Sequence, residues 1–320
     1  MIYKLKEKVK HGYLINKEEA KSLLTYDLKI LAACADELRK YFLGDKFDIC
    51  SIVNGKSGKC SEDCKFCAQS SFHRTNTEVY SLLDTEYLLK DAKHHKDKQV
   101  RRYSIVTSGR KLSDREIDKV CESFEEIIDK VGIETCASHG LLGEDSLTKL
   151  AKAGVKRYHN NLETSRNYFD KICTTHTYDE KIETIKAAQK AGLIVCSGGI
   201  MGLGESEEDR IDMAFELRDL NIKSIPLNVL NYIEGTAIER KNPITEEDFL
   251  KMVAIYRFIN PTAEIRLAGG RNLLSEFGKK AFTGGANATI TGDMLTTCGN
   301  QIDDDVKMIT KLGYQIWRDL

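Results

Sequence analysis

The sequence predicts an α/β protein, a parallel (β/α)8 barrel of the TIM type that carries a helical extension at its N-terminus. Eight short runs rich in β-forming residues recur along the chain, and helical patterns lie between them. Several of those patterns end at a glycine, as at Gly132, Gly154 and Gly192, which is a helix stop signal. Strands that alternate with helices favour a parallel sheet covered by helices. An open doubly wound sheet is the alternative.

The N-terminal elements come first. Residues 1–45 should be helical, because residues 17–26 and 27–43 place apolar side chains at helical spacing. The barrel should then occupy residues 46–300, and a C-terminal helix residues 301–320. We see no linker or low-complexity tract, so we expect a single domain over residues 1–320.

The barrel elements are short and regular. The predicted strands are residues 47–54, 101–109, 132–140, 155–161, 193–200, 223–230, 263–270 and 286–293. The clearest helical patterns between them are residues 113–132, 144–154 and 206–220. In such a barrel the active site lies at the carboxyl ends of the strands.

Composition excludes several classes of function. The chain has 320 residues and a net charge of -1, so nothing suggests a nucleic-acid or membrane partner. The first residues are charged and amphipathic without a secretory signal, and no apolar run is long enough to span a membrane. Ten cysteines in such a chain indicate reduced thiols and metal ligation. We therefore expect a cytoplasmic protein.

Three cysteines, Cys60, Cys64 and Cys67, form a C-x3-C-x2-C run directly after the first predicted strand. Cysteine thiolates hold iron–sulfur clusters, and three of them leave one iron of a 4Fe-4S cluster without a protein ligand. A zinc site usually shows a second cysteine or histidine pair, and none follows here. A disulfide fits neither the spacing nor the composition. The run therefore predicts an open-iron cluster on a loop at the barrel mouth.

Phe66 precedes the third cysteine, and C-x3-C-x-aromatic-C resembles the signature of the radical S-adenosylmethionine superfamily. The resemblance implies that the open iron binds S-adenosylmethionine and that one electron cleaves it to a 5′-deoxyadenosyl radical. That radical removes hydrogen from an unactivated carbon, while the protein orients the cofactor. The glycine-rich residues 196–206 resemble the adenosine-contacting strand of the superfamily, where glycines let the backbone approach a ligand.

A closer resemblance covers the chain from about residue 45 nearly to its end. The segments CSEDCKFCAQS, YHNNLETS, CTTHTY, VCSGGIMGLGE, IPLNVL, IRLAGGR and MLTTCGN occur in the order found in the biotin synthase family. The resemblance implies sulfur insertion between C6 and C9 of dethiobiotin, with one S-adenosylmethionine for each of two hydrogen abstractions. It also implies reduced flavodoxin or ferredoxin as electron donor, cluster-assembly proteins as partners, and a homodimer.

The resemblance also assigns roles to residues near the cofactor and substrate. Asn161 and Asn228 match polar contacts to dethiobiotin and the cofactor. Glu163 stands where the family often has Asp, and Lys181 where some members have Arg near the methionyl carboxylate. Lysine keeps that charge but loses the bidentate fork. The remaining cofactor-contacting positions are Phe66, Gly198, Gly199 and Ile200.

A second, auxiliary cluster deep in the barrel is where this chain departs from the family's best-known pattern. Cys136, Cys196 and Arg266 match three of four expected ligands, but Ser104 stands at the strand-two cysteine. Cys50 lies on the neighbouring strand one, so we infer that the third cysteine has moved there. Three cysteines favour a four-iron cluster with an extra sulfide over a 2Fe-2S cluster in which Arg266 is the fourth ligand. The alternative is that Cys50 is merely buried.

Two other functions and several weaker residues complete the predictions. Another radical S-adenosylmethionine barrel, such as a cluster maturase or amino-acid lyase, and a non-catalytic iron–sulfur electron carrier are the alternatives to sulfur insertion. Cys173 and Cys298 should lie on loops at the barrel mouth without being ligands, and Cys121 should pack in a helix. His139 and His176 should be hydrogen-bonded structural residues.

Overall fold

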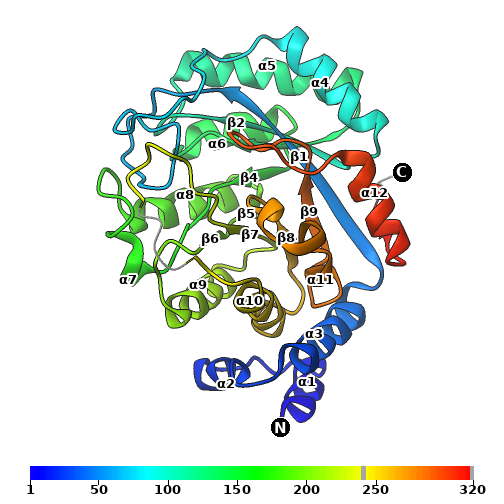
Figure 1. The fold of residues 1–320 in the computed structure, drawn as a ribbon. Coiled ribbons are helices and arrows are strands. Elements are labelled where there is room, and N and C mark those ends of the chain that lie inside the picture. Colours follow the sequence, from blue (N-terminus) through cyan, green and yellow to red (C-terminus); the bar gives the residue numbers. More distant parts are fainter. Residues whose placement is uncertain (239–242, 318–320) are drawn as a thin grey trace.

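The computed structural model describes residues 1–238 and 243–317, in which a closed parallel barrel is surrounded by helices (Figure 1). The strands are β1 Lys46–Lys56, β2 Arg102–Thr107, β3 Glu134–Ser138, β4 Arg157–His159, β5 Ile194–Cys196, β6 Gly199–Met201, β7 Ser224–Val229, β8 Glu264–Leu267, β9 Ala288–Thr291 and β10 Gln315–Ile316. They pair in chain order, β9 pairs back with β1, and β6 continues β5 against β7. The predicted (β/α)8 barrel is confirmed.

Helices follow most strands and cover the outside of the barrel (Figure 1). They are α1 Ile2–Lys10, α2 Lys17–Leu23, α3 Leu28–Leu43, α4 Thr85–Asp97, α5 Asp114–Lys130, α6 Glu144–Lys152, α7 Arg166–Phe169, α8 Tyr178–Lys190, α9 Glu207–Asp219, α10 Glu246–Ile259, α11 Lys279–Phe282 and α12 Ile302–Lys311. Ser113, Thr177 and Ser206 begin α5, α8 and α9 with capping boxes, which satisfy amide groups in the first turn. Within the described residues, no helix has the length and apolar character of a membrane span.

The N-terminal helices α1 to α3 form the predicted extension and lie below the barrel in the view of Figure 1. Helix α3 buries Leu31, Cys34, Ala35 and Leu38 on one face and packs on α10 and α1. Burying this apolar stripe contributes roughly 25 cal/mol for each Å² of surface removed from water. Cys34 is therefore a core residue, as its place in the helical pattern predicts.

The C-terminal segment differs from the predicted helix over residues 301–320. Helix α12 ends at Lys311, and Gly313 has a φ of +87°, a left-handed conformation that stops helices. Residues Gln315–Ile316 then form β10, which pairs in parallel with the start of β1. The apolar pattern of α12 therefore does not extend to the end of the chain.

The loop between β1 and α4 carries the C-x3-C-x2-C run, as predicted. Its backbone folds back on itself: the Cys60 amide donates to the Gln69 carbonyl at 2.9 Å, and the Ser71 amide donates to the Cys60 carbonyl at 2.8 Å. The Cys67 amide donates to the Cys64 carbonyl at 2.9 Å. These bonds gather the three cysteines into a compact turn at the carboxyl end of β1.

Candidate active site

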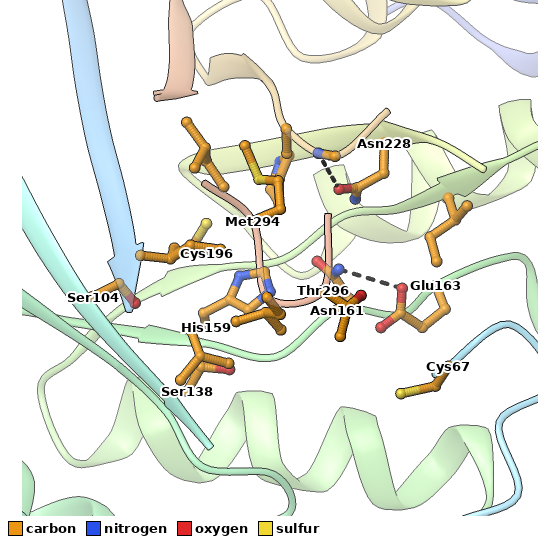
Figure 2. A pocket seen from close by; sticks show the side chains of 18 of the residues that line it. Cys67, Ser104, Ser138, His159, Asn161, Glu163, Cys196, Asn228, Met294 and Thr296 are labelled. Carbon is orange, nitrogen blue, oxygen red and sulfur yellow. Dashed lines mark hydrogen bonds between the residues drawn. The ribbon is translucent and has the colours of Figure 1, made fainter. Parts of the chain in front are cut away.

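A cavity of about 410 Å³ occupies the barrel and opens at the carboxyl ends of the strands. Figure 2 shows part of its wall, with labelled side chains from β2, β3, β4, β5 and β7 around the loop that carries Met294 and Thr296. The predicted site residues that line it are Cys50, Phe66, Cys67, Cys136, Asn161, Glu163, Lys181, Cys196, Ile200, Asn228 and Arg266. Cys60, Cys64, Gly198 and Gly199 are not among its lining residues.

Three thiols face the interior of the barrel from separate strands. Cys50 on β1, Cys136 on β3 and Cys196 on β5 are all buried. Burial raises the pKa of Cys50 and raises that of Cys136 to about 12, and negative charge on Cys196 adds to both shifts. All three also line the barrel cavity, so they border one enclosed space. Burial also opposes ionisation of Cys196, but a hydrogen bond with His159 lowers its pKa to about 7.

Ser104 lies beside this group of thiols, at the position where the family pattern has a cysteine. It faces the cavity from β2 and is in register with Cys136 on β3. Its hydroxyl hydrogen-bonds with the Cys136 thiol and favours the thiolate. Strand β1, which carries Cys50, is the direct neighbour of β2. The inferred displacement of the third cysteine therefore spans one strand of the sheet.

A layer of buried charges lies next to the thiols along the strands. Asp48 precedes Cys50 by two residues on β1, so both side chains have the same orientation across the sheet. Its carboxylate accepts hydrogen bonds from Arg101 and Arg102, each at 3.0 Å, and from Arg266. Burial favours the neutral acid, but the guanidinium groups, Arg266 first, hold the pKa of Asp48 well below its ordinary value.

Arg266 is held within this charged layer by three partners. Its guanidinium donates to Asp48, to Glu264 at 3.2 Å and to the Thr289 carbonyl at 2.9 Å. Burial disfavours its charge, yet Asp48 and the neighbouring Cys50 raise the pKa of Arg266 above the ordinary value. The side chain is therefore a charged guanidinium fixed by ion pairs at the edge of the cavity.

Asp48→Asn should destabilise the cluster-free protein by about 3–5 kcal/mol, because removing one partner of a buried ion pair leaves uncompensated charge in the interior. The loss should appear as a lower urea midpoint in equilibrium unfolding. Asp118→Asn is the matched control, since Asp118 pairs with Lys149 at 2.6 Å on the surface. That change should leave the free energy of unfolding nearly unchanged. Equal losses in the two variants would contradict the role given to Asp48.

Two glycines of residues 196–206, Gly198 and Gly199, pack closely against neighbouring backbone. A Cβ atom on Gly198 would lie 1.9 Å from the Pro226 carbonyl oxygen. A Cβ atom on Gly199 would lie 2.4 Å from the Glu163 carbonyl oxygen. Neighbouring backbone therefore fills the space where a side chain would stand at both positions, and Cys196 and Ile200 are the residues of this segment that line the cavity.

The segment after β4 carries the polar side chains of the cavity mouth. Glu163 has a φ of +72°, which is uncommon for a residue other than glycine and marks local strain. Its backbone is held on both sides, because its amide donates to Gly198 and its carbonyl accepts from Ile200. Asn161 donates to the Glu163 carboxylate at 3.3 Å, and burial raises the pKa of that carboxyl. The structure thus fixes a carboxylate at the mouth, with the buried Lys181 in the same wall.

Asn228 on β7 links two neighbouring strands at the cavity. Its side-chain amide donates to the Gly199 carbonyl at 2.9 Å and accepts from the Gly269 amide at 2.8 Å (Figure 2). The side chain is half-buried and lines the cavity. It is therefore held in one orientation with hydrogen-bonding capacity left for a ligand.

Several cavity residues were not singled out from the sequence. His159 on β4 touches Cys196, and Arg102 and Arg157 belong to the buried charged layer. Met294, Thr296 and Thr297 reach the cavity from the loop after β9 (Figure 2). The segment MLTTCGN was part of the family resemblance and could have identified that loop. Cys298, in the same segment, is exposed.

The two other histidines that the sequence marked as structural have different surroundings. His139 is buried, and its Nδ1 lies 3.0 Å from the Thr107 hydroxyl. Burial lowers its pKa to about 3, so it stays neutral at ordinary pH. His176 instead lies 3.3 Å from the thiol of Cys173, which in turn lies 3.7 Å from the thiol of Cys64.

Two family models match the chain. The radical SAM superfamily matches residues 56–217, and the Biotin and Thiamin Synthesis associated domain matches residues 226–315. The closed sheet runs through both matched segments, because β7, β8 and β9 complete the barrel against β1.

Curated relatives match over nearly the whole chain. A biotin synthase of Brachyspira hyodysenteriae is 58% identical over 312 residues, which are 98% of this chain and 94% of the relative. A biotin synthase of Clostridium perfringens is 54% identical over 316 residues, which are 99% of each chain.

Solved structures share the fold at low sequence identity. Methylornithine synthase PylB aligns with a TM-score of 0.86 at 18% identity and covers 98% of this chain and 97% of its own. The FeFe-hydrogenase maturase HydG from Carboxydothermus hydrogenoformans aligns with a TM-score of 0.81 at 15% identity, over 98% of this chain and 78% of its own. These likenesses concern the fold alone.

Proposed function

The chain belongs to the biotin synthase family of the radical SAM superfamily, and from this premise we propose how its residues divide the work on dethiobiotin. The enzymes of this family are radical SAM sulfurtransferases that use a 4Fe-4S cluster and S-adenosylmethionine. One observation carries the proposal. A single cavity is lined by Cys67 and Phe66 on the loop after β1 and by Cys50, Cys136 and Cys196 inside the strands.

We assign Cys60, Cys64 and Cys67 to the 4Fe-4S cluster. The donor chemistry fits, because three thiols lie on one folded loop; burial raises the pKa of Cys67 to about 11, and the Gln69 and Ser70 backbone amides partly offset that rise. Such bonds stabilise a thiolate. When bound, the cluster supplies the electron that cleaves S-adenosylmethionine, so that hydrogen can be removed from dethiobiotin. The loop's own part is to hold three thiolates at the cavity mouth.

We assign the cavity mouth to S-adenosylmethionine and dethiobiotin. Phe66 and Ile200 offer apolar surface, and Glu163 and Lys181 offer opposite charges in the same wall. These groups suit a ligand that carries an amine, a carboxylate and an adenosine. Gly198 and Gly199 are not lining residues of the empty cavity, but they lie beside Ile200 in the same segment, and we keep them as cofactor-contacting positions. Asn161 and Asn228 line the same cavity, where their amides can orient dethiobiotin.

We propose that Cys50, Cys136 and Cys196 hold the auxiliary cluster that supplies the sulfur atom. Three buried thiols that repel one another as thiolates fit a cationic group between them. The ion pairs of Arg266 support a four-iron cluster with an extra sulfide over the 2Fe-2S form. A guanidinium must lose a proton to bind iron, and its partner Asp48 favours the charged form. Arg266 would then position the cluster electrostatically without being its ligand.

Membership of this family also leads us to expect several partners. Reduced flavodoxin or ferredoxin would deliver electrons, cluster-assembly proteins would load both clusters, and the enzyme would work as a homodimer. We further propose that residues 1–320 act as one domain, since one closed sheet joins the segments that the two family models match.

The full chain, reconstituted with iron and sulfide under anaerobic reducing conditions, should convert dethiobiotin to biotin in the presence of S-adenosylmethionine. Production of 5′-deoxyadenosine should rise when dethiobiotin is added, because the substrate consumes the radical. Chromatography with mass detection measures both products. Failure to form biotin or its thiol intermediate would contradict the assignment, and absence of 5′-deoxyadenosine would favour an electron carrier instead.

A further inference from the structure

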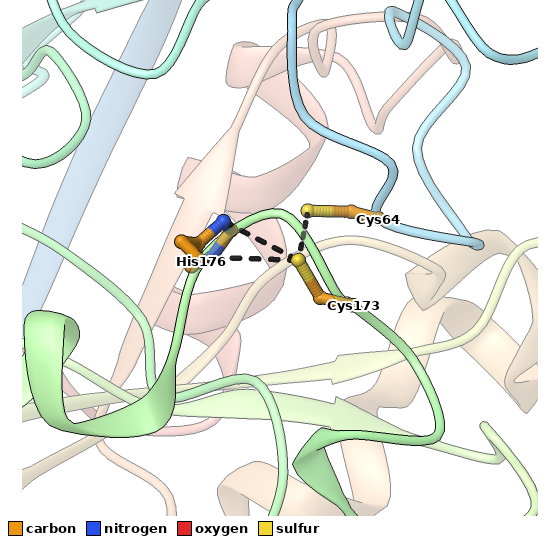
Figure 3. Close-up of side chains that lie close together, drawn as sticks. All are labelled: Cys64, Cys173 and His176. Carbon is orange, nitrogen blue, oxygen red and sulfur yellow. Dashed lines mark hydrogen bonds between the residues drawn. The ribbon is translucent and has the colours of Figure 1, made fainter.

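A second group of metal-ligand side chains lies beside the barrel cavity, outside its lining residues. Cys64, on the loop after β1, faces Cys173 and His176 on the loop between α7 and α8 (Figure 3). Their ligand atoms all lie within 4.8 Å of one another. Cys173 and His176 are 2% and 7% exposed. Two sulfurs and one imidazole therefore meet in a space that is largely closed to solvent.

The distances fit a tetrahedral metal ion. With metal–sulfur bonds of about 2.3 Å, two thiolates on a tetrahedral zinc ion lie about 3.8 Å apart, and a thiolate and an imidazole nitrogen about 3.6 Å. The Sγ atoms of Cys64 and Cys173 lie 3.7 Å apart. The Nε2 atom of His176 lies 3.8 Å from the Cys173 sulfur. A disulfide would need the two sulfurs at about 2.0 Å, much closer than they stand.

The Nδ1 atom of His176 lies beside a carboxylate, which is a common partner for the second ring nitrogen of a metal-binding histidine. Its Nδ1 lies 2.5 Å from the Glu62 carboxylate, so an Nδ1–H would donate to Glu62 and leave the Nε2 lone pair for a metal. Glu62 is itself buried and also accepts from Thr175 at 2.9 Å and from Arg110 at 3.2 Å. The imidazole is therefore oriented by a carboxylate that is fixed on its other side.

Hydrogen bonds join the loop that carries Cys64 to the loop that carries Cys173, on both sides of the contact between their sulfur atoms. The Lys65 amide donates to the Ile172 carbonyl at 2.9 Å. On the other side, the Asp63 carboxylate accepts from the backbone amides of Thr174 at 2.8 Å and Thr175 at 3.2 Å. The neighbours of both cysteines are thus bonded across the interface. The backbone therefore holds Cys64 and Cys173 on two loops that face each other.

We propose that Cys64, Cys173 and His176 Nε2 form a second metal site, which holds a single divalent transition-metal ion such as zinc or ferrous iron. The proposal rests on the assignment of Cys64 to the 4Fe-4S cluster. Because one thiolate serves both sites, the ion binds when the cluster is absent and leaves before the cluster can form. Three protein ligands leave the fourth position to water.

The chemistry of the three ligands selects the class of ion. Thiolates and imidazole favour zinc, ferrous iron and cobalt over magnesium or calcium, which prefer oxygen ligands. Binding transfers no electron: each thiol releases its proton to solvent, and two thiolates balance the two charges of the ion. The site would therefore protect Cys64 in the cluster-free protein, and excess zinc would delay cluster loading.

The test is a titration of the cluster-free, full-length protein with Co²⁺ under anaerobic conditions and a thiol-free reductant. Co²⁺ at this site should give thiolate-to-cobalt charge-transfer absorption beyond that of any Co²⁺ held by Cys50, Cys136 and Cys196, and Zn²⁺ should displace it. Cys173→Ala and His176→Gln should each weaken binding at least as much as changes to an outer-shell partner, which cost about 10- to 100-fold. Glu62→Gln should fall within that range.

Two comparisons separate this site from the cluster site. Cys67→Ala should bind Co²⁺ as the wild type does, although it lacks a cluster ligand. Cys173→Ala should still take up cluster iron on reconstitution, which also shows that the variant is folded. Preloaded Zn²⁺ should slow that uptake in the wild type and not in Cys173→Ala.

The opposite results would overturn the proposal. Co²⁺ absorption that is unchanged in Cys173→Ala and His176→Gln would place the ion on other thiols and not at this site, and absorption that is lost in Cys67→Ala would place it on the three cluster cysteines. If Cys64 were not a cluster ligand, Co²⁺ would still bind at this site, but Zn²⁺ would not slow cluster loading. The failure of the proposed site and the failure of the proposed function therefore give different results.

Discussion

Cys67→Ala should reduce cleavage of S-adenosylmethionine to the background of a protein-free control. Cys67 is the one cysteine of the C-x3-C-x2-C run that borders the cavity. Losing one of three thiolates should cost the chain about four irons, because cluster type and retention follow the ligand number. The measurements are iron per chain after reconstitution and 5′-deoxyadenosine after anaerobic reduction.

Cys121→Ala is the matched control for that variant. Cys121 is a half-buried cysteine in α5, on the outside of the barrel. Its removal deletes a thiol of the same size without touching the cavity, so iron content and 5′-deoxyadenosine should equal those of the wild type. If Cys67→Ala retained full iron and full cleavage, Cys67 would not be a ligand and the cluster would have to be sought elsewhere.

Local patterns predicted the fold well because the barrel repeats one unit. Strands alternate with helices along the chain, and helices such as α5 and α9 begin at residues that cap the first turn, Ser113 and Ser206. The ordered motifs of the family resemblance also identified site residues, most of which line the cavity. Periodicity failed at the C-terminus, where pairing of β10 with β1 depends on a contact between the two ends of the chain.

Contacts between distant segments account for the features that the sequence did not reveal. Gly198 lies in a glycine-rich segment, but the sequence does not show that a Cβ atom at this position would overlap the Pro226 carbonyl oxygen. Arginine side chains are mostly exposed in proteins. Arg102 is nevertheless buried, because it pairs with Asp48, which lies 54 residues away in the sequence. Cys173 lies 109 residues after Cys64 in the sequence, so only the folded chain shows that Cys173 and His176 lie beside Cys64.

Cys50→Ala should remove the auxiliary cluster while leaving cleavage of S-adenosylmethionine in place. Cys50 lies inside the barrel on β1, apart from the loop that carries Cys60, Cys64 and Cys67. The reconstituted wild type should hold about eight irons per chain if the auxiliary cluster is the four-iron form, and the variant about four. Biotin formation should fall to background, because the sulfur source is lost. Iron and sulfide analysis with Mössbauer spectra measures the first effect, and product analysis the second.

Arg266→Lys distinguishes the two forms of the auxiliary cluster. Lysine keeps a positive charge beside Asp48 but removes the guanidine that a 2Fe-2S cluster would need as its fourth ligand. If three cysteines suffice, the variant should keep about eight irons and its auxiliary Mössbauer signal. A wild type with about six irons that falls to about four in Arg266→Lys would establish the two-iron form with arginine ligation. An unchanged auxiliary signal in Cys50→Ala would instead make Cys50 a buried core residue, and the displacement of a cysteine from β2 to β1 would be wrong.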